Sequence, residues 1–132
     1  MTVEADPEFA ELDRIGRIIV DSVFKVHKAL GPGLRESIYE ACLFHELTKR
    51  GLKVRRQVPI PIRYDDLLLE SGLKLDLVVE GKVIIELKAV EKMIPLFEAQ
   101  LLSYLKLSGM RLGYLINFNS VLVKDGIKRM RN

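Results

Sequence analysis

Residues 73–90 contain two apolar runs, LKLDLVV and KVIIELKAV, on either side of Glu80-Gly81. Leu, Val and Ile favour strands, and a short polar connection with Gly favours a turn, so these residues predict an antiparallel hairpin. Asp76, Glu86 and Lys88 stand inside the two runs. Charged side chains in apolar strands cost free energy unless they are paired or bind a metal. The hairpin therefore predicts a sheet and marks a place where function is expected.

Helical and extended patterns surround the hairpin along the chain. Apolar residues at three-to-four spacing predict a helix from Pro7 to Leu30, and Gly31-Pro32-Gly33 ends it. The other predicted helices cover residues 34–50 and 95–109. The other predicted strands are 53–64, 67–72 and 111–118, with Asp65-Asp66 and Ser71-Gly72 as turns. Pro59 and Pro61 predict that the first of these strands is an edge strand or an irregular strand.

The order of these elements predicts an α/β fold, with helices flanking a mixed β-sheet in the order α-α-β-β-β-α-β. The last strand–helix–strand unit predicts one parallel, right-handed crossover. We expect a single domain over 1–132, with a core at about 9–119 and a basic, less ordered tail at 120–132.

Composition restricts the class of protein. The hydrophobic content of 48% and charged content of 30% are typical of a globular protein, and no run is long enough to span a membrane. The start lacks a signal-peptide pattern, and the one cysteine, Cys42, excludes an internal disulfide, so we expect a cytoplasmic protein. The net charge of +3 is compatible with a polyanion partner. Arg55, Arg56 and the tail either contact phosphates or form a solvated surface.

The geometry of the hairpin decides whether its charges meet. Glu86 and Lys88 are two residues apart in a strand and leave the same face, while Leu87 points into the core. A three-residue loop, 79–81, would pair Asp76 with Ile84 and bring Asp76 to the face of Glu86. Two carboxylates there suit Mg²⁺ or Mn²⁺, and a lysine suits charge stabilisation. The alternative is an ion pair on a half-exposed strand.

Two helical stretches carry further polar side chains on apolar faces. Glu36 shares a helix face with Tyr39 and Leu43, and either serves a site or is a helix-start carboxylate favoured by the macrodipole. Gln100 and Tyr104 lie one helical turn apart among leucines. They either line a cleft beside the hairpin or form part of the core with the hydroxyl at its rim.

Together these residues resemble the PD-(D/E)XK nuclease superfamily, and more narrowly its GxxExxY proteins. Gly33, Glu36 and Tyr39 in GLRESIY match the GxxExxY motif. Asp76 with Glu86-Leu87-Lys88 is similar to the metal-binding acid and E-x-K element, although Leu75 stands where the motif has proline. Gln100 and Tyr104 in QLLSY resemble the Q-x3-Y motif of RecB-like nucleases.

The resemblance implies a restriction-endonuclease-like core that binds Mg²⁺ or Mn²⁺. It implies that the metal ligands are Glu36, Asp76, Glu86 and the carbonyl of Leu87. Lys88 would assist the attacking water, and Gln100 and Tyr104 would contact substrate or support the acids. His27 resembles the helix-borne ligand of some RecB-like nucleases, but its position equally suits a helix-end residue; His45 is a weaker candidate.

The function expected from these features is metal-dependent hydrolysis of phosphodiester bonds in DNA. One alternative is a nucleic-acid-binding module that keeps the fold without catalysis. Another is a structural ion network in a protein that binds another protein. The small size favours a homodimer or a partner protein that delivers substrate.

Overall fold

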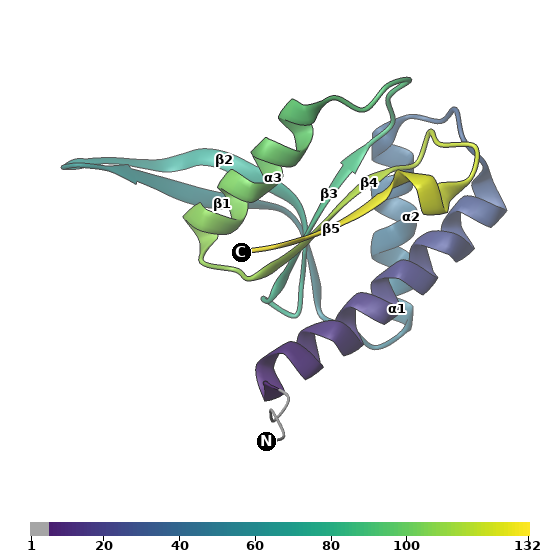
Figure 1. Cartoon of the computed structure of the whole chain (residues 1–132), viewed down its shortest axis with the longest axis horizontal. Coiled ribbons are helices and arrows are strands. Elements are labelled where there is room, and N and C mark those ends of the chain that lie inside the picture. The colour runs from purple at the N-terminus through teal and green to yellow at the C-terminus, as the bar shows by residue number, and fades with distance from the viewer. Residues whose placement is uncertain (1–5) are drawn as a thin grey trace, which may run out of the picture.

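The computed structural model describes residues 6–132 (Figure 1). The helices are α1 (Pro7–Leu30), α2 (Glu36–Lys49), α3 (Pro95–Ser108) and the 3₁₀ helix η1 (Val123–Gly126). The strands are β1 (Val54–Tyr64), β2 (Leu67–Val79), β3 (Val83–Lys88), β4 (Leu112–Asn117) and β5 (Ile127–Arg131). No helix among the described residues is long and apolar enough to cross a membrane.

The five strands form one mixed sheet in the order β1-β2-β3-β4-β5. β3 and β4 are parallel and are connected through α3, whereas the other neighbouring pairs are antiparallel. The predicted fold class and the parallel crossover are confirmed. β1 lies at the edge of the sheet, as its prolines predict, because proline cannot donate a hydrogen bond to a second neighbouring strand.

The helices cover the two faces of the sheet. α1 and α2 pack on one face, where Ile85 and Leu87 of β3 are buried with them. α3 packs on the other face, against Ile84 and Leu115. Alternate residues of β3 thus enter two separate cores, which explains why its first three residues and Leu87 are all apolar. Glu86 and Lys88 project to the α3 side, the same side as Ile84.

Local signals place the ends of α1 as predicted. The carboxylate of Asp6 accepts the N–H of Glu8 at 3.0 Å, and Gly31 ends the helix with a φ of 72°. An acidic N-cap satisfies a free helix N–H, and glycine adopts a positive φ without a steric penalty. Local signals therefore set where α1 begins and where it ends.

Two sequence predictions about the strands are wrong. Residues 67–79 form the single strand β2, because Ser71-Gly72 produces an irregularity in the β1–β2 register where a turn was expected. A Cβ on Gly72 would lie 2.6 Å from Ile62 Cδ1, so the close approach of the two strands requires glycine here. The C-terminal tail is also ordered, as η1 and β5, because β5 pairs with the otherwise open edge of β4.

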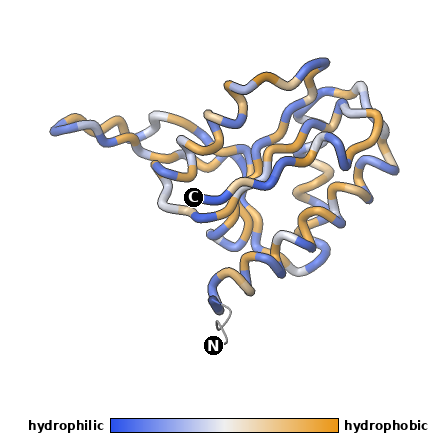
Figure 2. The backbone as a smooth tube through the Cα atoms, in the orientation of Figure 1, coloured by the Kyte–Doolittle hydropathy of each residue, from blue (hydrophilic) through white to orange (hydrophobic). Residues whose placement is uncertain are grey.

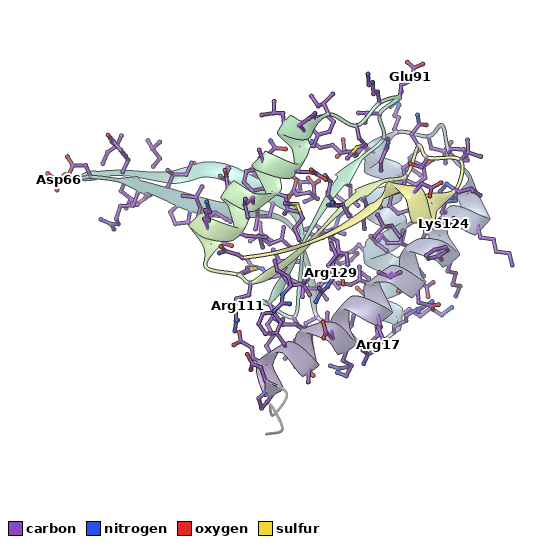
Figure 3. The ribbon with its side chains drawn as sticks, in the orientation of Figure 1. Arg17, Asp66, Glu91, Arg111, Lys124 and Arg129 are labelled. Carbon is purple, nitrogen blue, oxygen red and sulfur yellow. The ribbon has the colours of Figure 1, made fainter. Side chains whose placement is uncertain are left out.

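The outer part of β1 and β2, residues 61–72, projects beyond the rest of the sheet (Figure 1). We refer to these residues as the β1–β2 arm. Asp66 lies at its tip (Figure 3), and the tip is hydrophilic (Figure 2). Large apolar side chains are nevertheless exposed along the arm, among them Tyr64, Leu67, Leu68 and Leu69.

Candidate active site

The hairpin that carries the predicted acids has an odd-length loop, as expected. Leu77 pairs with Ile85 and Val79 with Val83, which leaves Glu80, Gly81 and Lys82 in the loop. The loop is one residue later than predicted, so the predicted pairing of Asp76 with Ile84 is wrong. In this loop Glu80 adopts a φ of 55° and Gly81 a φ of 65°, and the carboxylate of Glu80 accepts the N–H of Lys53 at 2.8 Å.

Leu77 and Ile85 are the last paired residues, so the next two residues, Asp76 and Glu86, lie opposite each other. Here hydrogen bonds from the main chain to side chains take the place of the main-chain hydrogen bonds between the strands. Glu86 Oε1 accepts the N–H of Asp76 at 3.0 Å. Asp76 Oδ2 accepts the N–H of Leu87 at 2.8 Å. Since the N–H and C=O of a residue in a strand point to the same side, the Leu87 carbonyl is also directed toward Asp76. Three groups with oxygen atoms that can bind a metal therefore lie together where β2 and β3 stop pairing: the carboxylates of Asp76 and Glu86 and the carbonyl of Leu87.

Burial changes the protonation of both acids. Glu86 is only 5% exposed, and desolvation together with the charge of Asp76 raises its pKa to about 8. Desolvation also raises the pKa of Asp76, while the hydrogen bond from the Leu87 N–H opposes that change. Neither acid forms an ion pair with lysine or arginine within residues 6–132. A divalent cation would supply the missing positive charge.

Lys88 follows the acids on β3, and its ammonium group is held by α3. Its Nζ donates to Gln100 Oε1 at 3.4 Å and lies 4.4 Å from the centroid of the Phe97 ring. A cation above an aromatic face is stabilised by the ring's electron density. Gln100 is thus brought to the hairpin as predicted, whereas Phe97 escaped the sequence analysis because an aromatic residue in an apolar helix has no distinctive spacing.

Tyr104 lies one turn further along α3. Desolvation raises the pKa of its phenol, and the charges of Glu86 and Asp76 raise it further. An effect of both acids on this hydroxyl means that Tyr104 faces the same region as the acids. Gln100 and Tyr104 therefore line the α3 side of the site.

Glu36 is the first residue of α2. Its pKa is raised mainly by desolvation and next by the charge of Asp76, while Lys88 opposes the change. Glu36 consequently lies within electrostatic reach of the hairpin, although its side chain is more open to solvent than those of the other acids.

Tyr39 explains the spacing of the Gly33, Glu36 and Tyr39 motif. Its hydroxyl donates to the Gly31 carbonyl at 2.6 Å and accepts the N–H of Leu34 at 3.1 Å. Its ring stacks on Phe118 with centroids 4.5 Å apart. The buried tyrosine fixes the loop before α2, in which Gly33 has a φ of 95°, and thereby fixes where Glu36 begins the helix.

Glu40 lies near the candidate site, where its charge raises the pKa of Asp76, and the sequence analysis missed it. It is 7% exposed and lies one helical turn after Glu36. Its carboxylate accepts hydrogen bonds from Gln57 Nε2 at 2.6 Å and from Arg56 Nη2 at 3.1 Å. The i, i+4 spacing of two glutamates was a usable signal, but their partners on β1 were not visible in the sequence. Arg56, for which phosphate contact and a solvated surface were both left open, pairs with Glu40, and its side chain remains 41% exposed.

Among residues 6–132, neither histidine forms a hydrogen bond or ion pair with Asp76 or Glu86. His27 is buried, and its Nε2 donates to the Ser120 carbonyl at 2.8 Å, so it holds the chain after β4 against α1. A carbonyl only accepts, so this nitrogen carries the proton and is not free to bind a metal. His45 is exposed and lines a surface hollow of about 290 Å³ with Lys25 and Cys42.

The donors present fit a hard divalent cation. Within residues 6–132, no three Asp, Glu, His or Cys side chains form a group that could hold a metal. Mg²⁺, however, commonly takes one or two carboxylates and keeps several waters. Asp76, Glu86 and the Leu87 carbonyl would satisfy that requirement, and the lack of a lysine or arginine partner for either acid among residues 6–132 favours it.

The comparisons with known proteins agree with this geometry. A family model described as the PD-(D/E)XK nuclease superfamily matches residues 13–130. The matched region includes both faces of the sheet and every residue of the candidate site. No match was found among curated proteins or among solved structures.

Proposed function

We propose, from the premise that this chain belongs to the PD-(D/E)XK nuclease superfamily, that it is a metal-dependent nuclease that hydrolyses phosphodiester bonds of DNA. We further assign it to the GxxExxY proteins, on the basis of Gly33, Glu36 and Tyr39. The helix carboxylate and the buried tyrosine of that motif have distinct roles here, one electrostatic and one structural.

The observation that carries the proposal is that neither the buried Glu86 nor the half-buried Asp76 has a cationic partner among the described residues. Glu40 and Glu46 are about as buried as Glu86, and each forms an ion pair with an arginine. Asp76 and Glu86 have none within the described residues, and the nearby ammonium of Lys88 contacts α3 instead. A purely structural network would supply a cationic partner; without one, burial raises the pKa of Glu86 to about 8, so this acid retains a proton at neutral pH until a cation binds.

Each residue of the candidate site has a proposed role in metal binding or in catalysis. Asp76, Glu86 and the Leu87 carbonyl would hold Mg²⁺ or Mn²⁺, with Glu36 as a further carboxylate, and the ion would stabilise phosphate charge and lower the pKa of a bound water. Lys88 provides positive charge for the attacked phosphate or orients the attacking water. Gln100 and Phe97 hold its ammonium in position, and the Tyr104 hydroxyl is available to substrate or to the acids.

The test is cleavage of labelled single-stranded DNA, duplex DNA and RNA with Mg²⁺, Mn²⁺ or EDTA. Wild type should cleave DNA only with metal, and Asp76→Ala and Lys88→Ala should each lose at least about 100-fold in rate. Lys25→Ala is the matched control, because this lysine pairs with Glu46 away from the site.

Each other outcome has its own meaning. Equal cleavage by wild type and both site variants would indicate a contaminating nuclease. Tight DNA binding without cleavage would favour a non-catalytic binding module, and neither binding nor cleavage would favour a structural role for the acids. Cleavage of RNA alone would correct the substrate.

We also propose that the protein works as a homodimer through the β1–β2 arm. Cross-strand pairs Ile62–Leu69 and Tyr64–Leu67 place four apolar side chains on one face of the arm. A two-stranded ribbon alone is marginally stable in water, and Tyr64 is 77% exposed. The acidic tip, with Asp65 and Asp66, disfavours nucleic acid as the cover and is complementary to a second copy of this basic chain.

A further inference from the structure

We infer that Glu40 is a positioning residue. By binding α2 to a kink in β1, it sets the distance between Glu36, which begins α2, and Asp76 on β2. The inference rests on the proposed function, because it concerns the same candidate metal site. Glu40 itself is not assigned as a ligand: its Oε1 accepts Gln57 Nε2, and its Oε2 accepts Nε and Nη2 of Arg56.

Gln57 is the residue that requires this contact. It has a φ of 49° within a strand, where side chains other than glycine are strained. Such a conformation persists only when surrounding contacts fix it. Its side-chain Nε2 donates to Glu40 Oε1 at 2.6 Å.

The kink at Gln57 lies directly across the sheet from Asp76. Arg56 pairs with Leu77 and Val58 pairs with Leu75, so Gln57 and Asp76 occupy the unpaired position between them. Here the side chains of both strands change face. Leu77 packs with α1 and α2, whereas Leu75, two residues away, packs in the core beneath α3. In a regular strand these two leucines would share one face.

The change of face has a consequence for the site. Asp76 leaves the regular pattern where its N–H binds Glu86 and its carboxylate binds the Leu87 N–H. The kink in β1 therefore belongs to the same irregularity that aims Asp76 at β3. Because Glu40 fixes this kink from the helix that begins with Glu36, it sets how far Glu36 lies from Asp76.

α2 contains a matched control. Glu46 is on the same helix, is 8% exposed where Glu40 is 7%, and also binds an arginine, Arg50. Its other partner is Lys25 of α1, so it does not contact β1 through these bonds. Glu40→Ala and Glu46→Ala remove equivalent buried carboxylates, but only the first removes the contact with Gln57.

The first experiment compares amide hydrogen exchange in the metal-free full chain. Exchange at Asp76 and Leu87 should accelerate at least about 10-fold more in Glu40→Ala than in Glu46→Ala, because local opening exposes these two N–H groups. Equal acceleration in the two variants would overturn the inference. If Glu40→Ala does not fold, Glu40→Gln is measured against Glu46→Gln.

The second experiment measures Mn²⁺ affinity by electron paramagnetic resonance. Loss of a residue that orients ligands typically weakens metal binding about 10- to 100-fold, which we expect for Glu40→Ala but not for Glu46→Ala. Adding Gln57→Gly to Glu40→Ala should restore most of the affinity, since glycine adopts this φ without strain. No recovery would overturn the positioning role and would make Glu40 a ligand.

The two experiments separate this inference from the proposed function. If wild type neither binds Mn²⁺ nor cleaves DNA, the proposed function fails. A difference in exchange between Glu40→Ala and Glu46→Ala would still support the positioning role in that case, because it is measured without metal or substrate.

Discussion

Glu86 accepts the main-chain N–H of Asp76 at 3.0 Å, so a side chain takes the position in the sheet that a carbonyl of β3 would otherwise occupy. The carboxylate of Asp76 does the same for Leu87. The main-chain N–H groups of Asp76 and Leu87 thus fix the orientation of the two carboxylates. Their geometry exists before any ion binds, and its cost is two desolvated carboxylates.

The metal-free protein should lose stability as the pH rises. The pKa of Glu86 is about 8 in the folded protein, against an ordinary value of 4.5. Its stabilising contribution is therefore complete below pH 4.5 and is lost as the pH rises toward 8, by about 3 to 5 kcal/mol. Urea unfolding in EDTA from pH 5 to pH 8.5 measures this. Glu86→Gln should flatten the dependence, and an equally steep decline in that variant would contradict the assignment.

Divalent metal should reverse this loss and release protons. Below pH 8 the metal must displace the proton that the buried acids retain, so the affinity should increase from pH 6 to pH 8. Calorimetry with Mn²⁺ in buffers of different ionisation enthalpy counts the protons released. Asp76→Asn should show little binding at either pH, whereas Lys25→Ala should bind as wild type does. Binding that does not depend on pH would mean that the ion binds elsewhere.

Tyr39→Phe should destabilise the protein and weaken the site together. The substitution removes the donor to the Gly31 carbonyl and leaves the Leu34 N–H without its acceptor, which should cost about 1 to 3 kcal/mol. Because the loop before α2 loosens, the Mn²⁺ affinity should also fall. Urea unfolding and metal titration measure the two effects. Tyr64→Phe is the control, since Tyr64 is exposed and should change neither quantity.

Polar substitutions in the β1–β2 arm should dissociate the proposed dimer. Tyr64→Ser with Leu67→Ser removes the most exposed apolar side chains of one face and should raise the dimer dissociation constant at least about 10-fold. Light scattering after size-exclusion chromatography measures the mass over a range of concentrations. Val121→Ser, at an exposed apolar residue outside the arm, is the control. A wild-type monomer at about 100 μM would rule out a dimer of the strength typical of specific interfaces.

The positions of elements with strong local signals were predictable. α1 begins and ends where Asp6 and Gly31 indicate, because caps and glycine act within a few residues. The tail was mispredicted because the sequence of β5 lacks the apolar alternation that marks a strand. Lys128 and Arg129 are exposed, and the strand forms because its main chain pairs with β4. Ser71-Gly72 was mispredicted for a related reason, since glycine serves a bulge as readily as a turn.

The sequence by itself singled out the acids and the lysine of the candidate site, because charged side chains inside apolar strands are unfavourable unless they are paired or bind a metal. It also determined that Glu86 and Lys88 share a face, since strand periodicity is a local property. Only the tertiary structure decided that Asp76 faces Glu86 directly and that Glu40 joins α2 to Gln57. Those relationships depend on strand register and helix packing, which arise from contacts between residues far apart in the chain.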